Sequence, residues 1–380
     1  MELDIRFLVM ISPQLFLQCL NKQSIKFYAG VPDSLLQHFC NYITEHVSSD
    51  NHIVCANEGG AIGLATGYHL ATKEIGLVYM QNSGLGNAIN PLLSIADKEA
   101  YSIPMLLLIG WRGEPGTDDE PQHRKQGRCT IPLLQVMEIP HQILPDNSES
   151  AEKVIHAAVD HMRKESEPFA IIVKRGTFLP YRLKEEQDSV YPSREHVIRL
   201  IVDSLETEDL LCATTGMIAR EVFDYRKQSG HDHKRDFLCV GGMGHVSQLA
   251  LGVASRKTNS KVFCLDGDGS VIMHMGSLAI NGAQKLQNFI HIILNNGCHD
   301  SVGGQPTVGW NLKFVEIAHA VGYNKVLYAT SFADIERSLA VLRTSQGPCF
   351  LEIRVKKGHR ESLGRPTKGL VQMKTAFMKF

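Results

Sequence analysis

Short aliphatic runs alternate with longer segments of helical periodicity along most of this chain. Gly, Asn or Asp bounds many of the runs, a pattern typical of parallel strands buried between layers of helices. In the first half the expected strands are 25–29, 52–56, 76–80, 105–109 and 169–173, with helices over 60–72 and 87–96. In the second half they are 210–213, 237–240, 261–265, 290–294, 326–329 and 349–355. The sequence therefore predicts an α/β fold with mainly parallel sheets.

The alternation is interrupted once, by the charged, proline-bearing segment 184–193, which indicates a linker. At 380 residues the chain is also long for a single hydrophobic core. We therefore predict two α/β domains, 1–183 and 194–380, joined by residues 184–193.

Charge and cysteine content narrow the range of partners. Lys and Arg number 39 against 40 Asp and Glu, so no global field draws in nucleic acid or a membrane surface. The nine cysteines are scattered and form no CxxC pair, which favours buried free thiols in a reducing compartment over disulfides or a zinc site. The apolar opening is interrupted by Pro13 and has no small-residue cleavage site after it, so Ser12 and Pro13 predict a helix start. We expect a cytoplasmic protein with no nucleic-acid or membrane partner.

One βαβ unit carries the strongest chemical pattern. The segment "GSVIMHMGSLAINGAQKL" suits a helix between the strands 261–265 and 290–294, so these two strands should be parallel. Asp268 and Asn296 then emerge beyond the carboxyl ends of the strands, where open α/β sheets bind ligands. Carboxylate, amide and backbone carbonyl oxygens suit Mg²⁺ that completes its octahedron with phosphate oxygens and water. The turn through Gly267, Gly269 and Ser270 leads into a helix N-terminus and offers backbone N–H groups to a diphosphate.

Two alternatives exist for this glycine turn. A Gly-Asp-Gly sequence by itself is a common turn without a ligand. A dinucleotide site is the other candidate, but the spacing is not GxGxxG and no acidic residue ends the next strand to hold a ribose.

The GDG turn with "NN" one βαβ length later closely resembles the metal and diphosphate motif of thiamine diphosphate enzymes. The resemblance implies two thiamine diphosphate-binding-fold domains, each a mainly parallel sheet flanked by helices, with no middle domain. Residues 1–183 would be the pyrimidine-binding domain and 194–380 the diphosphate-binding domain. It implies thiamine diphosphate and Mg²⁺ as cofactors, with Asp268, Asn296 and the Cys298 carbonyl as metal ligands.

Further segments resemble the same family in the expected order. "HIVCANEGGAIGLATGYHLAT" supplies Glu58, which would bond the pyrimidine N1′ atom and activate the cofactor. A lone Glu is usually exposed, but this one stands in a nearly uncharged, glycine- and alanine-rich context. "CVGGMGHVSQLALGVA" would hold the thiamine, with the Gly241 carbonyl on the 4′-amino group and Met243 beneath the cofactor. "TTGM" would bring Thr215 and Gly216 to the diphosphate.

Several segments resemble phosphonopyruvate decarboxylases: "MQNSGLGNAINPL", "GWRGEPG", "DEPQHRKQGR", "HDSVGGQPTVGW" and "LGRPT". The resemblance implies decarboxylation of phosphonopyruvate to phosphonoacetaldehyde and CO₂ in phosphonate biosynthesis, with His299 relaying protons or binding the leaving carboxylate. The candidate substrate contacts are Asn82, Arg112, His123 and Arg128. The basic members lie in an expected loop after the strand 105–109, where acidic neighbours make a solvated charge run the alternative.

Three other functions stay open. They are decarboxylation of sulfopyruvate, carboligation of the acetolactate synthase type, and thiamine diphosphate binding by a regulatory protein without catalysis. Retention of Glu58, Asp268 and Asn296 argues against the last of these. The resemblance also implies a homodimer or higher oligomer with active sites at the subunit interface.

Overall fold

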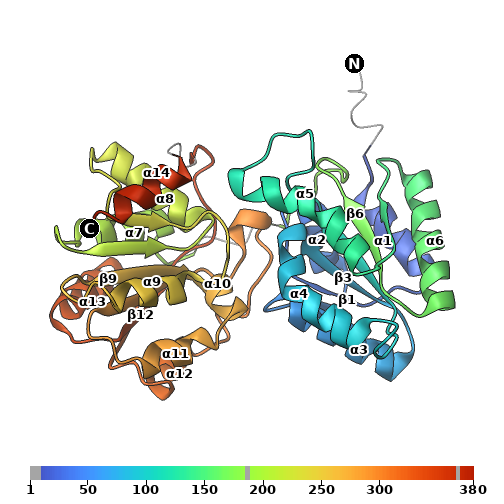
Figure 1. Ribbon diagram of the computed structural model, residues 1–380. Helices are drawn as coiled ribbons and strands as arrows, with labels where there is room; N and C mark the ends of the chain where they lie inside the picture. The colour runs from blue at the N-terminus through green and yellow to red at the C-terminus, as the bar shows by residue number, and fades with distance from the viewer. Residues whose placement is uncertain (1–9, 185–188, 365–368) are drawn as a thin grey trace, which may run out of the picture. The chain divides into compact units, whose positions relative to one another are not determined.

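The computed structural model describes residues 10–184, 189–364 and 369–380. Its contacts divide the chain into two compact units (Figure 1), Met1–Glu185 with Val302–Gln305, and Glu186–Ser301 with Pro306–Phe380. We call them unit 1 and unit 2. Part of the predicted linker, 185–188, lies outside the described residues.

Unit 1 is built on a six-stranded sheet with the strand order β2-β1-β3-β4-β6-β5, and every neighbouring pair is parallel. The strands are β1 (Tyr28–Gly30), β2 (His52–Val54), β3 (Gly76–Gln81), β4 (Met105–Gly110), β5 (His141–Ile143) and β6 (Phe169–Val173). The helices are α1 (Pro13–Lys22), α2 (Gln37–His46), α3 (Glu58–Thr72), α4 (Leu85–Pro91), α5 (Pro121–Val136) and α6 (Ser148–Glu165), with the short turns η2 (Asn82–Gly84) and η3 (Leu92–Ala96).

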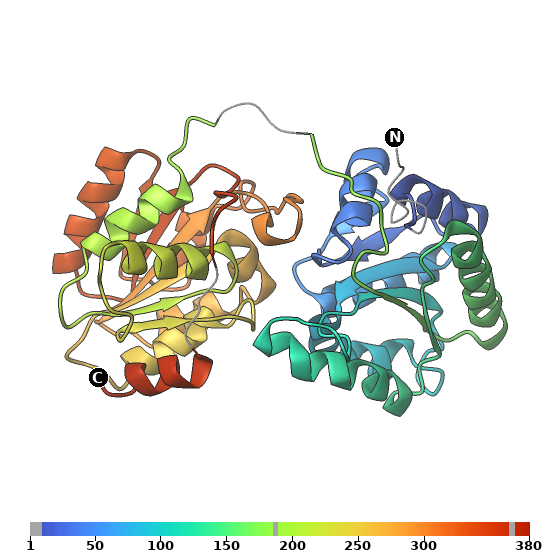
Figure 2. The same ribbon diagram turned by 90° about the horizontal axis from the view of Figure 1, so that it is seen from above.

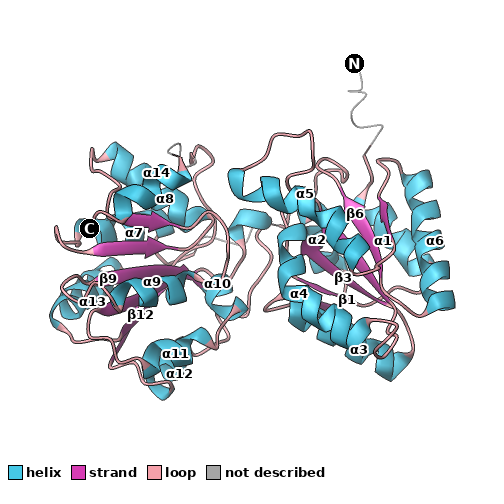
Figure 3. Cartoon of the chain, in the orientation of Figure 1, coloured by secondary structure: helices cyan, strands magenta, loops and turns pink. Residues whose placement is uncertain are grey.

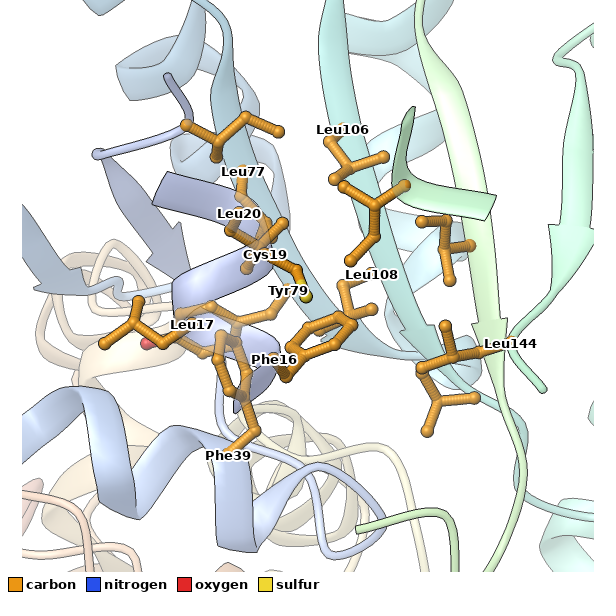
Figure 4. Close-up of a cluster of buried hydrophobic side chains, with 14 of the residues drawn as sticks. Phe16, Leu17, Cys19, Leu20, Phe39, Leu77, Tyr79, Leu106, Leu108 and Leu144 are labelled. Atoms are coloured by element: carbon orange, nitrogen blue, oxygen red, sulfur yellow. The ribbon is translucent and has the colours of Figure 1, made fainter. Parts of the chain in front are cut away.

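Helices cover both faces of this sheet. Leu106 and Leu108 of β4 pack with residues of α1, α2 and α6, as Figure 4 shows for Phe16 and Phe39. The intervening Leu107 packs on the other face with residues of α3, α4 and α5. Burial on both faces explains why the strand is a continuous apolar run instead of an alternating one.

Unit 2 repeats this plan with the order β11-β12-β10-β9-β7-β8, again parallel throughout. Its strands are β7 (Leu210–Ala213), β8 (Asp236–Leu238), β9 (Val262–Gly267), β10 (Phe289–Asn295), β11 (Lys325–Ala329) and β12 (Cys349–Arg354). Its helices are α7 (Arg194–Asp203), α8 (Met217–Gln228), α9 (Val246–Ala254), α10 (Asp268–Met273), α11 (Ser277–Ala283), α12 (Phe314–Ala320), α13 (Phe332–Thr344) and α14 (Leu370–Phe377), with the short turn η4 (Asp300–Val302), whose last residue belongs to unit 1. Apolar residues of α7, α8 and α13 pack on one face and those of α9, α11 and α12 on the other, and both layers are visible in Figures 2 and 3.

The structure corrects four local predictions. The first strand starts at Tyr28 instead of residue 25, because Ser24 adopts a left-handed φ of 65° and the Ile25 N–H bonds back to Leu20 to close α1. Strand β5 was not predicted, since this three-residue edge strand is only partly buried and has no apolar run.

The other two corrections concern helices. The single helix expected between β9 and β10 is two, α10 and α11, because His274 leaves helical geometry with φ −135° and ψ 52°. The expected basic loop is largely the helix α5, which begins at Pro121. Proline fits the first turn of a helix, where its missing N–H is not needed.

All nine cysteines are free, as predicted, although Cys129 and Cys239 are only partly buried. Among the described residues, no helix combines the length and the apolar character needed to cross a membrane.

Candidate active site

Four neighbouring strands of unit 2 end at the residues predicted to bind the cofactor. Asn296 follows β10, Asp268 follows β9, Thr215 follows β7 and Gly241 follows β8. The sheet order is β10-β9-β7-β8, and the strands are parallel. These residues therefore lie along one edge of the sheet, where α/β sheets bind ligands.

Asp268 is a buried carboxylate, 1% exposed, at the first position of α10. It accepts hydrogen bonds from the Thr307 hydroxyl and from the backbone of Asn296, yet its burial raises the pKa to about 6. A Cβ added at Gly309 would lie 2.4 Å from Asp268 Oδ2. The segment around Gly309 can therefore pack against the carboxylate only with glycine at this position. A buried carboxylate with a raised pKa is ready for a cation, because the cation would offset the cost of its charge.

The Asn296 side chain is fixed at both ends. Its Nδ2 donates to Asp300 Oδ2 at 2.7 Å, and its Oδ1 accepts from the Cys298 N–H at 3.2 Å. Burial raises the pKa of Cys298, whose thiol donates to Asp300 Oδ1 at 3.1 Å. Cys298 therefore stays a neutral thiol, which leaves its carbonyl oxygen as the hard donor that the family resemblance implies.

Ser270 joins three of the predicted cofactor segments. Its hydroxyl lies 3.0 Å from Thr214 Oγ1, beside Thr215 and Gly216, and accepts from the Gly244 N–H at 3.1 Å. Gly244 has a left-handed φ of 86° and ends the segment of Gly241 and Met243, both partly buried. The turn of Gly267, Gly269 and Ser270 is thus tied to both neighbouring loops.

His299 packs against the same turn. A Cβ at Gly269 would lie 2.7 Å from His299 Cε1, so the imidazole is in contact with the glycine backbone. Burial lowers the pKa of His299 to about 4, and the ring is neutral at pH 7. A neutral imidazole can accept a proton on one nitrogen and release one from the other.

A second polar group lies below this edge, in the core of unit 2. Cys264, Asp266 and His291 come within 4.8 Å of one another and are at most 1% exposed. Asp266 accepts from the Gly267 N–H at 2.9 Å, and His291 pairs with the Tyr323 hydroxyl at 3.1 Å. Because the three side chains are sealed in the core, we assign them to the core packing of unit 2, where Asp266 also holds the Gly267 turn.

In unit 1, Glu58 starts α3 directly after the N-cap residue Asn57, whose side chain accepts from the Gly60 N–H at 2.9 Å. Glu58 is 5% exposed, and its Oε2 accepts from Asn87 Nδ2 at 2.8 Å. A Cβ added at Gly84 would lie 2.3 Å from Glu58 Oε1. The carboxylate is therefore held between an amide donor and a glycine backbone.

The predicted substrate contacts of unit 1 are mostly engaged within the unit. Asn82 donates both amide hydrogens, to the Arg112 carbonyl at 2.8 Å and to Thr130 Oγ1 at 2.9 Å. Arg112 forms a two-pronged ion pair with Asp119, and His123 Nδ1 lies 3.0 Å from the same carboxylate. These contacts favour a scaffolding role for Asn82 and a neutralised charge on Arg112.

Arg128 differs from these residues, because it lies exposed on α5. Burial and the charge of Arg112 lower the pKa of His123, although Asp119 opposes this shift. The structure thus brings Arg112 and His123 together and leaves Arg128 in solvent.

Four contributors to the site were not predicted: Gly84, Asn87, Asp300 and Thr307. Each acts through a contact with a predicted residue. The sequence signal that could have found them is weak: Asn87 lies in the quoted "MQNSGLGNAINPL", and Asp300 and Thr307 in "HDSVGGQPTVGW".

Comparison with known proteins agrees with this arrangement. The N-terminal TPP binding domain of thiamine pyrophosphate enzymes matches residues 12–132, and their C-terminal TPP binding domain matches residues 214–353. The chain therefore belongs to the thiamine pyrophosphate (thiamine diphosphate) enzyme family. The prediction of two thiamine diphosphate-binding domains of α/β fold is confirmed.

Within this family the chain is similar to phosphonopyruvate decarboxylases, as predicted. It is 31% identical to that of Streptomyces viridochromogenes over 93% of this chain and 90% of the relative. It is also 31% identical to that of Streptomyces hygroscopicus, over 94% of this chain and 90% of the relative. A sulfopyruvate decarboxylase of Methanosarcina acetivorans is 22% identical over 92% of each chain.

Proposed function

We propose that this protein decarboxylates 3-phosphonopyruvate to phosphonoacetaldehyde and CO₂, with thiamine diphosphate and Mg²⁺, in phosphonate biosynthesis of the 2-aminoethylphosphonate type. The observation that carries the proposal is the 31% identity to two phosphonopyruvate decarboxylases over more than nine-tenths of the chain. The buried Glu58 and the Asp268–Asn296 pair support it, because they supply the groups that such an enzyme needs.

The residues of unit 2 fit a diphosphate-bound Mg²⁺. Asp268, Asn296 Oδ1 and the Cys298 carbonyl are hard oxygen donors, and three protein ligands leave positions for phosphate oxygens and water. The raised pKa of Asp268 indicates that its carboxylate is short of a positive partner. Thr215, Gly216, Gly267, Gly269 and Ser270 would contact the diphosphate, and Gly241 and Met243 the thiamine.

Thiamine diphosphate, when bound, would supply the nucleophile and the electron sink that decarboxylation of a 2-oxo acid needs. Glu58, fixed by Asn87, would share a proton with the pyrimidine N1′ atom. His299, neutral at pH 7, would relay the proton that replaces CO₂ on the product carbon. Arg112, His123 and Arg128 stay the proposed contacts of the phosphonate and carboxylate, and Asn82 would hold Arg112 in place. Arg112 and His123 would have to exchange part of their pairing with Asp119 for the substrate.

A substrate panel tests this proposal. We expect kcat/KM for CO₂ release from phosphonopyruvate to exceed that for sulfopyruvate and pyruvate by about 10-fold or more, since a dianion gains more from the cationic side chains proposed to bind it. Faster turnover of sulfopyruvate would show that sulfopyruvate is the substrate. Formation of a carbon–carbon coupled product with added acetaldehyde would show that the protein is a carboligase. Cofactor binding without turnover of any 2-oxo acid would point to the regulatory alternative.

Gly84 gives a sharp test of the Glu58 position. Gly84 has right-handed backbone angles of φ −72° and ψ −14°, so alanine is allowed there except for its collision with the carboxylate. Gly84→Ala should therefore lower kcat for phosphonopyruvate by about 100-fold, the effect of a reacting group displaced by about 1 Å. Gly86→Ala is the matched control, because a Cβ there meets nothing within 4 Å. Equal activity of the two variants would contradict the assigned role of Glu58.

We also propose a homodimer or higher oligomer, with unit 1 of one chain and unit 2 of its partner completing each site. The division of Glu58 and Asp268 between the two units makes such sharing possible, because one cofactor must meet both residues. The nine free thiols support a cytoplasmic location.

A further inference from the structure

We propose that Asp300, held by Arg194, is a positioning residue that turns the Asn296 amide oxygen toward the metal. The inference rests on the proposed function, because it assigns a role toward the Mg²⁺ named there. Asp300 would not itself be a metal ligand. It would act through Asn296.

The carboxylate of Asp300 receives four donors from three parts of unit 2. Its Oδ2 accepts from Asn296 Nδ2 at 2.7 Å and from Arg194 Nη1 at 2.6 Å. Its Oδ1 accepts from the Gly358 N–H and from the Cys298 thiol, both at 3.1 Å. Both oxygens are thus engaged, and the carboxylate cannot rotate without breaking several bonds.

Arg194 fixes the position of this carboxylate. It is 5% exposed, and its Nε and Nη2 bond the two oxygens of Glu221 at 2.9 and 3.0 Å. The remaining Nη1 reaches Asp300. Because Arg194 starts α7 and Glu221 lies on α8, two helices of unit 2 anchor the loop after β10.

The chemistry of Asp300 decides how the Asn296 amide is oriented. A carboxylate only accepts hydrogen bonds, so it selects the NH₂ end of the amide and disfavours a flip. The other end of the amide, Asn296 Oδ1, then faces away from Asp300, and one of its lone pairs accepts from the Cys298 N–H. The second lone pair is available beside Asp268, whose carboxylate accepts from the Asn296 backbone.

The substitution Asp300→Asn tests this role. An asparagine carries one acceptor oxygen, and its NH₂ must face either the Asn296–Arg194 pair or the Gly358–Cys298 pair, which are all donors. We expect the Mg²⁺ dissociation constant, measured by calorimetry at saturating thiamine diphosphate, to rise about 10- to 100-fold, as for other partners of metal ligands. Asp203→Asn is the matched control: Asp203 also accepts a side-chain bond, from Tyr225 at 2.6 Å, but lies at the exposed end of α7.

A double-mutant cycle separates positioning from general support of the fold. In an Asn296→Ala background, Asp300→Asn should cause no further loss of Mg²⁺ affinity, because the amide that it orients is gone. Additive losses, or an unchanged Mg²⁺ affinity of Asp300→Asn, would overturn the inference. Arg194→Lys, which keeps the charge but loses the forked bond to Glu221, should give an intermediate loss and provides a second route if Asp300→Asn does not fold.

These binding measurements need no substrate. If the wild-type protein binds Mg²⁺ with the cofactor and decarboxylates phosphonopyruvate while Asp300→Asn binds Mg²⁺ equally well, only the positioning role fails. If the wild-type protein does not bind Mg²⁺ with the cofactor, the proposed function fails first, and the positioning role falls with it.

Discussion

Glu58→Gln should lower decarboxylation of phosphonopyruvate by about 10²- to 10⁴-fold, the usual contribution of a positioned acid or base. Glutamine keeps the shape of the side chain between Asn87 and Gly84 but cannot exchange a proton with the pyrimidine N1′ atom. Affinity for Mg²⁺ should change little, because its proposed ligands all lie in unit 2. The measurements are the rate of CO₂ release at saturating cofactor and calorimetric binding of cofactor and metal.

The control for this variant is Glu149→Gln, since Glu149 is an exposed residue of the same unit that pairs with Lys153 on the surface of α6. That substitution should leave the rate within a factor of about two, as is usual for a surface change. A Glu58→Gln variant that retains most of the wild-type rate would remove Glu58 from the mechanism.

Asp268→Asn should weaken Mg²⁺ binding at least about 100-fold, because a buried amide brings no charge to the cation. The same substitution should stabilise the protein when no metal is bound. The pKa of Asp268 is raised from 3.8 to about 6 by burial, so its ionised form costs the folded state up to about 3 kcal/mol above pH 6. At pH 7 the metal-free variant should therefore have a higher melting temperature than the metal-free wild-type protein. This difference in melting temperature should vanish as the pH falls below about 4. A lower melting temperature at pH 7 would contradict the assignment.

Together, Glu58→Gln and Asp268→Asn test how the two units combine. If each site uses unit 1 of one chain and unit 2 of its partner, a hybrid dimer has one site with both substitutions and one with neither. At a Mg²⁺ concentration too low to fill the Asp268→Asn site, coexpression with random pairing should then restore roughly a quarter of the wild-type activity, although each variant alone retains little. Sites formed within single chains would give no recovery.

The sequence was informative where the chemistry lies in neighbouring residues. The apolar runs identified eleven of the twelve strands, including all eight central ones, because strands buried on both faces are mainly apolar. Asp268 and Asn296 could be paired because β9 and β10 are consecutive and parallel, so their ends meet. Glu58 stood out through its uncharged surroundings, and it is indeed buried.

Features that depend on contacts across the chain could not be predicted. The bond from Asn87 to Glu58 spans 29 positions, and that from Arg194 to Asp300 spans 106. A prediction also failed at α5, where the basic segment was expected to form a loop, although proline is accepted in the first helical turn. The charge run there appeared available to a substrate, yet Asp119 pairs with Arg112 and His123.

The central claim, thiamine diphosphate-dependent decarboxylation of phosphonopyruvate, is tested most directly by following the phosphorus signal of this substrate by NMR. The protein stripped of cofactor should leave phosphonopyruvate unchanged. Addition of thiamine diphosphate and Mg²⁺ should convert it to phosphonoacetaldehyde, with one CO₂ for each molecule consumed. Unchanged phosphonopyruvate in the presence of protein that demonstrably binds both cofactors would contradict the account.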